Sequence, residues 1–125
     1  DWDTIWRMVV DLYKSLLTKE RNYFTIIDGI MAGEGQGPFC PTSKHANVLL
    51  GGNDLLLTDI AAVRYMGLDP LKIKYLEYFI RTWNIDLSQL PVYLFGEHRE
   101  DFFSAPTRYA DFEVPFAWRG IKYTV

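Results

Sequence analysis

Ile26–Pro38, with the sequence IIDGIMAGEGQGP, is the stretch from which the fold is best inferred. A short β-branched and aromatic run, Tyr23–Ile27, leads into it and predicts a buried strand. We expect a glycine-rich loop to follow this strand and to extend to about Lys44. Three glycines alternate in the loop: Gly33, Gly35 and Gly37. Glycines at that density let the backbone approach a ligand closely, because no Cβ atom intervenes.

Carboxylates accompany these glycines. Asp28 lies just upstream of them, and Glu34 lies between the first two. A phosphate-binding loop of the Walker type ends in Gly-Lys-Ser/Thr, whereas Gly37 is followed here by Pro38. A dinucleotide-binding loop needs its glycines to open a helix, and Pro38 disfavours helical geometry in the residue before it. The loop therefore favours a cation or a hydrogen-bond donor as its ligand over a bare phosphate.

The composition is that of a chain with enough apolar residues to form a core. Of the 125 residues, 49% are hydrophobic, so we predict a single domain over residues 1–125. The formal net charge is −3 and the basic residues are scattered, which argues against a nucleic-acid partner. Cys40 is the single cysteine, so the chain itself provides no internal disulfide, four-cysteine zinc site or iron–sulfur cluster.

No targeting or membrane signal is visible in the sequence. No uninterrupted apolar run approaches the roughly 18 residues of a membrane span, and no signal peptide is recognisable. We therefore expect no membrane partner and a cytoplasmic location.

Periodicity and capping residues predict three helices. The first runs from Asp3 or Thr4 to about residue 17, the second from Asn53 or Asp54 to about residue 66, and the third begins at Asp69-Pro70. The first helix carries two apolar stripes, so we expect it to be covered on two sides. These stripes are Ile5, Met8, Val9, Leu12 and Leu16, and Trp6, Val10, Tyr13 and Leu17.

Three short strands are expected between and after these helices, at 23–27, 46–50 and 91–95. Strands that alternate with helices indicate an α/β or α+β architecture. We predict a small mixed sheet in a single layer, flanked by three or more helices. From Glu97 onward the sequence is aromatic, proline-spaced and non-periodic, which predicts an irregular C-terminal tail.

Asp59 is the most unusual single residue, because it lies inside the second predicted helix with apolar residues one turn before and one turn after it. A carboxylate on such a face is desolvated and costs several kcal/mol unless it has a partner. Two explanations stay open: a structural ion pair with Arg64, Arg7 or a lysine of the tail, and a site carboxylate with a shifted pKa. Asp54 is more simply explained as the helix cap.

The candidate site combines three carboxylates, Asp28, Glu34 and Asp59, as catalytic residues and as metal ligands. They converge if the first two strands pair and the second helix packs over them. Oxygen ligands without thiolates favour Mg²⁺, Mn²⁺ or Ca²⁺ over zinc. Cys40 and His45 offer a competing nucleophile–base pair, which requires that the two side chains meet in space.

Three segments together resemble a known family, the domain of unknown function 362. They are IIDGIMAGEGQGP, NVLLGGNDLLLTDIAAVRYMGLDP (Asn47–Pro70) and PVYLFGE. The resemblance covers nearly the whole chain and corresponds to the C-terminal part of longer members. The chain departs from the usual pattern at 39–42, where members tend to carry a further glycine and a small residue.

The resemblance implies candidate residues but no activity. The acidic motif positions fall on Asp28, Glu34, Asp54 and Asp59, and the loop glycines, as cofactor-binding positions, on Gly29, Gly35 and Gly37. The family has no generally established activity, although some members are fused to ferredoxin-like iron–sulfur modules. A ferredoxin-like module or the rest of a parent protein is therefore the expected partner.

Three functions follow as alternatives. The first is an enzyme-type domain whose acidic site binds a divalent cation or acts as a general base. The second is a non-catalytic interaction module whose aromatic tail docks on a partner. The third, an iron–sulfur-linked oxidoreductase subunit, rests on the family association alone. The sequence does not decide whether the chain is an enzyme.

Overall fold

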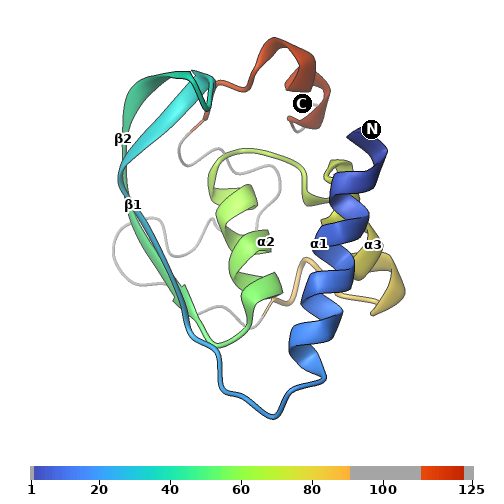
Figure 1. The fold of residues 1–125 in the computed structure, drawn as a ribbon. Helices are drawn as coiled ribbons and strands as arrows, with labels where there is room; N and C mark the ends of the chain where they lie inside the picture. Colours follow the sequence, from blue (N-terminus) through green and yellow to red (C-terminus); the bar gives the residue numbers. More distant parts are fainter. Residues whose placement is uncertain (1, 91–110, 123–125) are drawn as a thin grey trace.

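A computed structural model describes residues 2–90 and 111–122 of the chain. A long β-hairpin forms one layer, helix α2 lies behind it, and helices α1 and α3 form the far side (Figure 1). The mixed architecture of helices and a small sheet is therefore confirmed. The elements are α1 (Trp2–Leu17), β1 (Thr25–Gln36), β2 (Cys40–Gly52), α2 (Leu55–Tyr65), α3 (Lys74–Thr82) and two 3-10 turns, η1 (Pro70–Lys72) and η2 (Phe116–Ile121).

The hairpin replaces the predicted glycine-rich loop. β1 and β2 pair antiparallel from Thr25 opposite Gly52 to Gln36 opposite Cys40. The loop prediction over 28–44 was wrong because the glycines serve cross-strand contact. A Cβ atom on Gly33 would meet the Cβ of Pro41 at 2.9 Å, and one on Gly29 would meet Val48 Cγ1 at 2.7 Å. Glycine spacing of two residues is here the period of a strand.

One irregularity interrupts the hairpin. Gly29 is opposite Val48 and Met31 is opposite His45, so Ile30 faces two residues of β2. One of these two, Asn47, has a φ of 53°, the left-handed conformation that asparagine tolerates. The arrangement is a β-bulge, which bends the strand and increases its twist.

Helix α2 begins and ends as its sequence predicts. The Asp54 carboxylate accepts a hydrogen bond from the Leu57 N–H at 2.9 Å, and Gly67 follows the helix with a φ of 76°. The third helix differs from prediction, because Pro70 opens only a 3-10 turn and α3 starts at Lys74. Between them Ile73 is extended, with φ −104° and ψ 110°.

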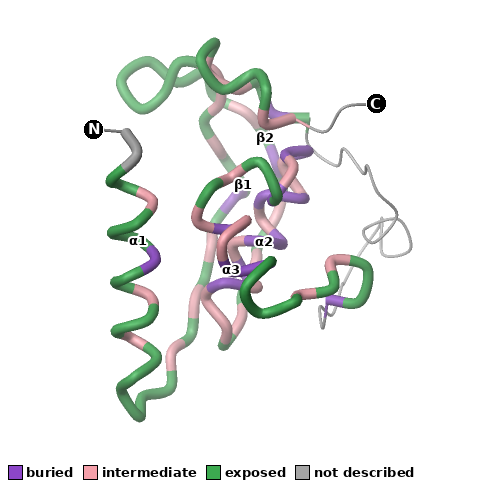
Figure 2. The backbone as a smooth tube through the Cα atoms, turned by 90° about the vertical axis from the view of Figure 1, so that its right-hand side faces the viewer, coloured by how far each residue is buried: buried purple, intermediate pink, exposed green. Residues whose placement is uncertain are grey.

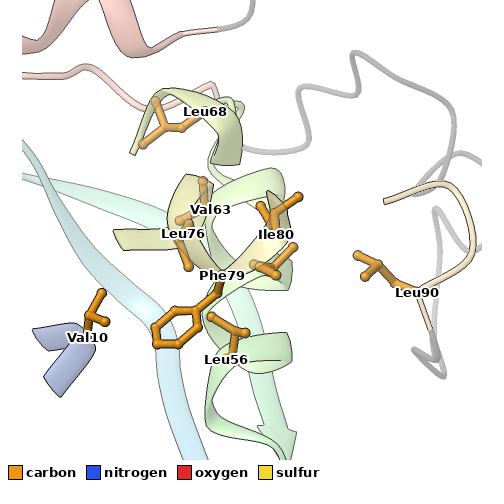
Figure 3. Close-up of a cluster of buried hydrophobic side chains, with 9 residues drawn as sticks. Val10, Leu56, Val63, Leu68, Leu76, Phe79, Ile80 and Leu90 are labelled. Atoms are coloured by element: carbon orange, nitrogen blue, oxygen red, sulfur yellow. The ribbon is translucent and has the colours of Figure 1, made fainter. Parts of the chain in front are cut away.

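The core lies between α2 and α3, and α1 closes it (Figure 3). Phe79 of α3 is almost fully buried, and Tyr13 of α1 meets it edge-on with ring centroids 5.2 Å apart. Burying an aliphatic or aromatic side chain contributes about 1.5–3 kcal/mol, so this cluster anchors α1 to α3. Its buried members are Val10, Leu56, Ile60, Val63, Leu68, Leu76, Phe79, Ile80 and Leu90.

Only one of the two apolar stripes of α1 is covered in the described part of the chain. Val10 is buried, whereas Ile5, Met8 and Leu12 are 57%, 64% and 64% exposed. Figure 2 shows this helix exposed along much of its length. The predicted strand at 91–95 and most of the tail from Glu97 lie outside the described residues. No helix among those described has the length and apolar character of a membrane span.

Candidate functional site

Asp59 lies on α2 and is half-buried where that helix faces α3. The hydroxyl of Tyr75, on α3, donates a hydrogen bond to its carboxylate at 3.1 Å. Burial raises the pKa of the Asp59 carboxyl above its ordinary value, and the hydrogen bond from Tyr75 offsets part of that rise. The sequence left an ion pair and a site carboxylate open as explanations of Asp59, and the structure adds a phenol as the hydrogen-bond partner of its carboxylate.

A second acid and a second phenol lie beside this pair. The Tyr13 hydroxyl of α1 is 3.4 Å from the Asp54 carboxylate. Burial has the largest effect on the pKa of Tyr13 and raises it. The negative charge of Asp54, and more weakly that of Asp59, raise this pKa further. Burial and the Asp59 charge likewise raise the pKa of Tyr75. We call these four residues the acid–phenol seam; its phenols stay protonated as donors while Asp59 holds its proton to a higher pH than a solvated aspartate does.

Glu34 lies near the tip of the hairpin and has a different environment. Its carboxylate accepts hydrogen bonds from the Lys44 ammonium and from the backbone N–H of Glu113, each at 2.9 Å. Both hydrogen bonds lower the pKa of this carboxyl below its ordinary value, and the one from the Glu113 N–H has the larger effect. Lys44 also donates to the Asp111 carbonyl at 3.2 Å. Glu34 and Lys44 therefore hold residues 111–113 against the hairpin.

This attachment was not predicted from the sequence. Glu34 and Glu113 are 79 positions apart, and no local pattern links them. Phe112 contributes to this attachment, because its ring is buried and the Lys44 ammonium lies 5.3 Å from the ring centroid. In the sequence, however, Phe112 is one aromatic residue among many in the tail.

Asp28 occupies a third, separate place. It is exposed on β1, and its carboxylate accepts the backbone N–H of Ile30 at 3.0 Å, inside the bulge. Six strand positions separate it from Glu34, which corresponds to roughly 20 Å. Across residues 2–90 and 111–122 the structure contains no group of three His, Cys, Asp or Glu residues arranged to hold a metal ion. Each of the three predicted carboxylates has its own local partner, and metal binding by them stays a prediction.

The other predicted site residues have structural contacts. Gly35 has a φ of 78°, and its N–H donates to the Glu113 carbonyl at 2.9 Å. Gly29 faces Val48 inside the sheet, and Gly37 lies in the turn with open space around it. Their role in binding a cofactor stays a prediction. Cys40 and His45 lie on one strand about 17 Å apart by strand geometry, too far for a nucleophile–base hydrogen bond.

A surface hollow of about 290 Å³ lies at the end of α1, away from the acid–phenol seam. It is lined by Leu16, Leu17, Lys19, Arg21, Asn22, Tyr23 and Asn53. Neither Asp59 nor Tyr75 lines it, so this hollow is separate from the acid–phenol seam.

Comparison with known proteins identifies the family. Residues 2–64, just over half of the chain, match the model described as Domain of unknown function (DUF362), and the chain belongs to this family. The matched region contains α1, the whole hairpin and nearly all of α2. No curated protein and no solved structure matches the chain.

Proposed function

We propose that this member of the domain of unknown function 362 family is a non-catalytic interaction module that binds a partner protein through α1. The observation that supports this is the exposed stripe formed by Ile5, Met8 and Leu12. These residues recur at the i, i+3, i+7 spacing of one helix face, and contiguous exposed apolar surface of this kind marks interaction sites.

The helix is well suited to present that stripe. Val10 and Tyr13 hold its other side against the core, so the exposed side does not depend on induced folding. Asp11 and Lys14 are exposed and separate the two stripes on the remaining side. A partner that covered the stripe would gain apolar burial without rearranging the domain.

The partner that we propose is another part of a longer family architecture. The resemblance in sequence predicts that this chain corresponds to the C-terminal part of longer members. The family match begins at residue 2, so it includes the stripe. A ferredoxin-like module is the competing partner, and it would connect the domain with redox chemistry.

Site-specific photo-crosslinking in the producing cell tests the proposal. A benzoylphenylalanine at position 8 should crosslink to one partner peptide, while the same group at Asp11 on the polar side should not. Leu12→Lys should remove the crosslink from position 8 without unfolding the domain, because Leu12 is 64% exposed. Equal crosslinking from positions 8 and 11 would reject α1 as the binding surface. The mass of the crosslinked peptide distinguishes a parent segment from a ferredoxin-like module.

A second candidate function uses the acid–phenol seam. The raised pKa of Asp59 and its contact with Tyr75 support a general-base role or a cation site at this acid. A thermal-shift titration with Mg²⁺, Mn²⁺ and Ca²⁺ beside Asp59→Asn tests the cation role. Binding to the folded state alone adds about 2.7 kcal/mol at a hundredfold excess over Kd. A saturable shift that the variant lacks supports the site, and no shift with any ion removes it.

A further inference from the structure

We propose that the outer edge of β1 binds an extended segment of a partner protein through backbone hydrogen bonds, and that one face of this segment carries a basic residue between two apolar residues. This surface is separate from the stripe on α1. It is formed by the backbone of Met31 and Gly33 together with the side chains of Ile26, Asp28 and Ile30.

One hydrogen bond shows to which side the backbone N–H and C=O groups of β1 point near the tip of the hairpin. Gly35 is paired with Pro41, which has no N–H, and the Gly35 N–H points away from β2 to the Glu113 carbonyl at 2.9 Å. In an antiparallel strand the backbone groups of alternate residues point to the same side. No register shift occurs between Met31 and Gly35, so the N–H and C=O groups of Met31 and Gly33 also point outward.

Near the tip of the hairpin, the outer edge of β1 already makes one backbone hydrogen bond to another segment of the chain. The Gly35–Glu113 hydrogen bond is held in place by Glu34, which accepts the Glu113 N–H. Within residues 2–90 and 111–122 the sheet has two strands only, and no further strand continues this pairing toward Met31. A partner segment would extend an arrangement that the chain itself starts.

The two edges of the hairpin differ in how they are protected. β2 carries Pro41 and Lys44 and contains the left-handed Asn47, features that discourage strand addition. β1 has the sequence TIIDGIMAGEGQ, without lysine, arginine or proline. Ile26, Ile30 and Met31 on β1 are 71%, 52% and 55% exposed. The edge without lysine or proline is therefore also the one with more exposed apolar side chains.

Charge identifies the kind of segment that fits. The two charged residues of β1 are both acidic, and Asp28 is exposed among the apolar side chains. A second copy of β1 would bring only carboxylates to this edge. A basic residue opposite Asp28 would instead form an ion pair, and apolar residues two positions before and after it, on the same face, would cover Ile26 and Ile30.

A designed peptide can probe this edge directly. The probe is a fluorescein-labelled octapeptide, Thr-Val-Thr-Lys-Thr-Val-Thr-Thr, added to the whole chain; its lysine lies between its two valines on one face of the extended peptide. Matched peptides carry glutamate in place of lysine, or N-methyl groups on alternate residues that block backbone pairing. Met31→Pro removes one outward N–H and leaves the β1–β2 ladder intact, with Met31→Val as its control. Circular dichroism and the urea midpoint establish that both variants fold.

The proposal expects the following outcomes. The amides of Met31 and Gly33 exchange with solvent rapidly in the free chain and slow when the valine–lysine peptide is added. Met31→Pro and the N-methylated peptide each weaken binding at least tenfold, as does glutamate in place of lysine, whereas Met31→Val changes it less than twofold.

Four results would overturn it. Slow exchange at both amides without peptide would mean that the chain covers its own edge. Absence of peptide binding, or binding that Met31→Pro leaves unchanged, would exclude pairing at this edge. A dimer in sedimentation that Met31→Pro dissociates would identify a second copy as the occupant in place of a basic segment. None of these results involves α1, so the interaction-module proposal is judged separately by its crosslinks.

Discussion

Glu34 and Asp59 are both acids within the region that matches the family, and the molecule places them in opposite environments. Glu34 has a cation and a backbone N–H against its carboxylate, which lower its pKa. Asp59 is half-buried beside a phenol, and burial raises its pKa. The comparison shows that carboxylates alike in sequence differ in what they do for the fold. Charge at Glu34 stabilises the folded state, whereas charge at Asp59 costs free energy that Tyr75 only partly offsets.

Removing the cation beside Glu34 should have the largest effect. Lys44→Met would leave a carboxylate that is 14% exposed with one donor fewer, and it would also release the Asp111 carbonyl. We expect a loss of about 2 kcal/mol in the free energy of unfolding, measured by urea denaturation at pH 7. The same change should increase proteolysis near residues 111–113. A loss below about 0.5 kcal/mol would show that this ion pair does not hold the C-terminal segment.

The two isosteric variants should differ in sign and in pH dependence. Glu34→Gln should cost about 1.5 kcal/mol at pH 7, because a charge-assisted hydrogen bond is lost. Asp59→Asn should leave stability unchanged or raise it, since the amide removes the desolvated charge while its oxygen still accepts from Tyr75.

The pKa directions fix the expected pH profiles. Glu34 has a lowered pKa, so its contribution is present above its ordinary pKa of 4.5 and is lost as pH falls through its folded value. Asp59 has a raised pKa, so stability declines as pH rises from its ordinary 3.8 through its folded value. We expect urea denaturation from pH 3 to 8 to show two separate changes. Glu34→Gln should reduce the loss of stability at low pH, and Asp59→Asn should reduce the decline of stability with rising pH. Parallel profiles for the two variants would contradict the contrast.

Tyr75→Phe tests the phenol at the seam and should have a smaller effect. Asp59 would lose its donor, its pKa should rise further, and stability at pH 7 should fall by about 1 kcal/mol. A double-mutant cycle with Asp59→Ala isolates the pair, because alanine offers the phenol no acceptor. A coupling free energy near zero would mean that the phenol contributes through packing alone.

The parts of the fold that could be predicted are those that local sequence determines. Asp54 caps α2 and Gly67 follows it because capping and left-handed stops depend on a few adjacent residues. The hairpin was misread because alternating glycines are compatible with both a loop and a strand. What separates these readings is the partner strand, where Val48 and Pro41 approach Gly29 and Gly33.

The candidate site shows the same limit more strongly. Sequence singled out Asp59 correctly as an acid on an apolar helix face, and burial raises its pKa as such a position suggests. Its partner Tyr75 lies on another helix, and Glu34 contacts a residue 79 positions away. Side-chain partners at such separations depend on tertiary packing, so the expected convergence of three carboxylates could not be tested before the strands and helices were placed.

The smallest effect should come from an exposed ion pair in the same C-terminal segment. Lys122 donates to the Asp111 carboxylate at 3.1 Å, but the Asp111 side chain is 59% exposed and solvent screens the pair. Lys122→Gln should therefore change the free energy of unfolding by less than about 0.5 kcal/mol in urea, and added salt should reduce even that difference. Lys44→Met is the matched comparison, since both lysines contact residue 111. Comparable losses from the two variants would show that the segment is held by its total charge and not by the Glu34 carboxylate.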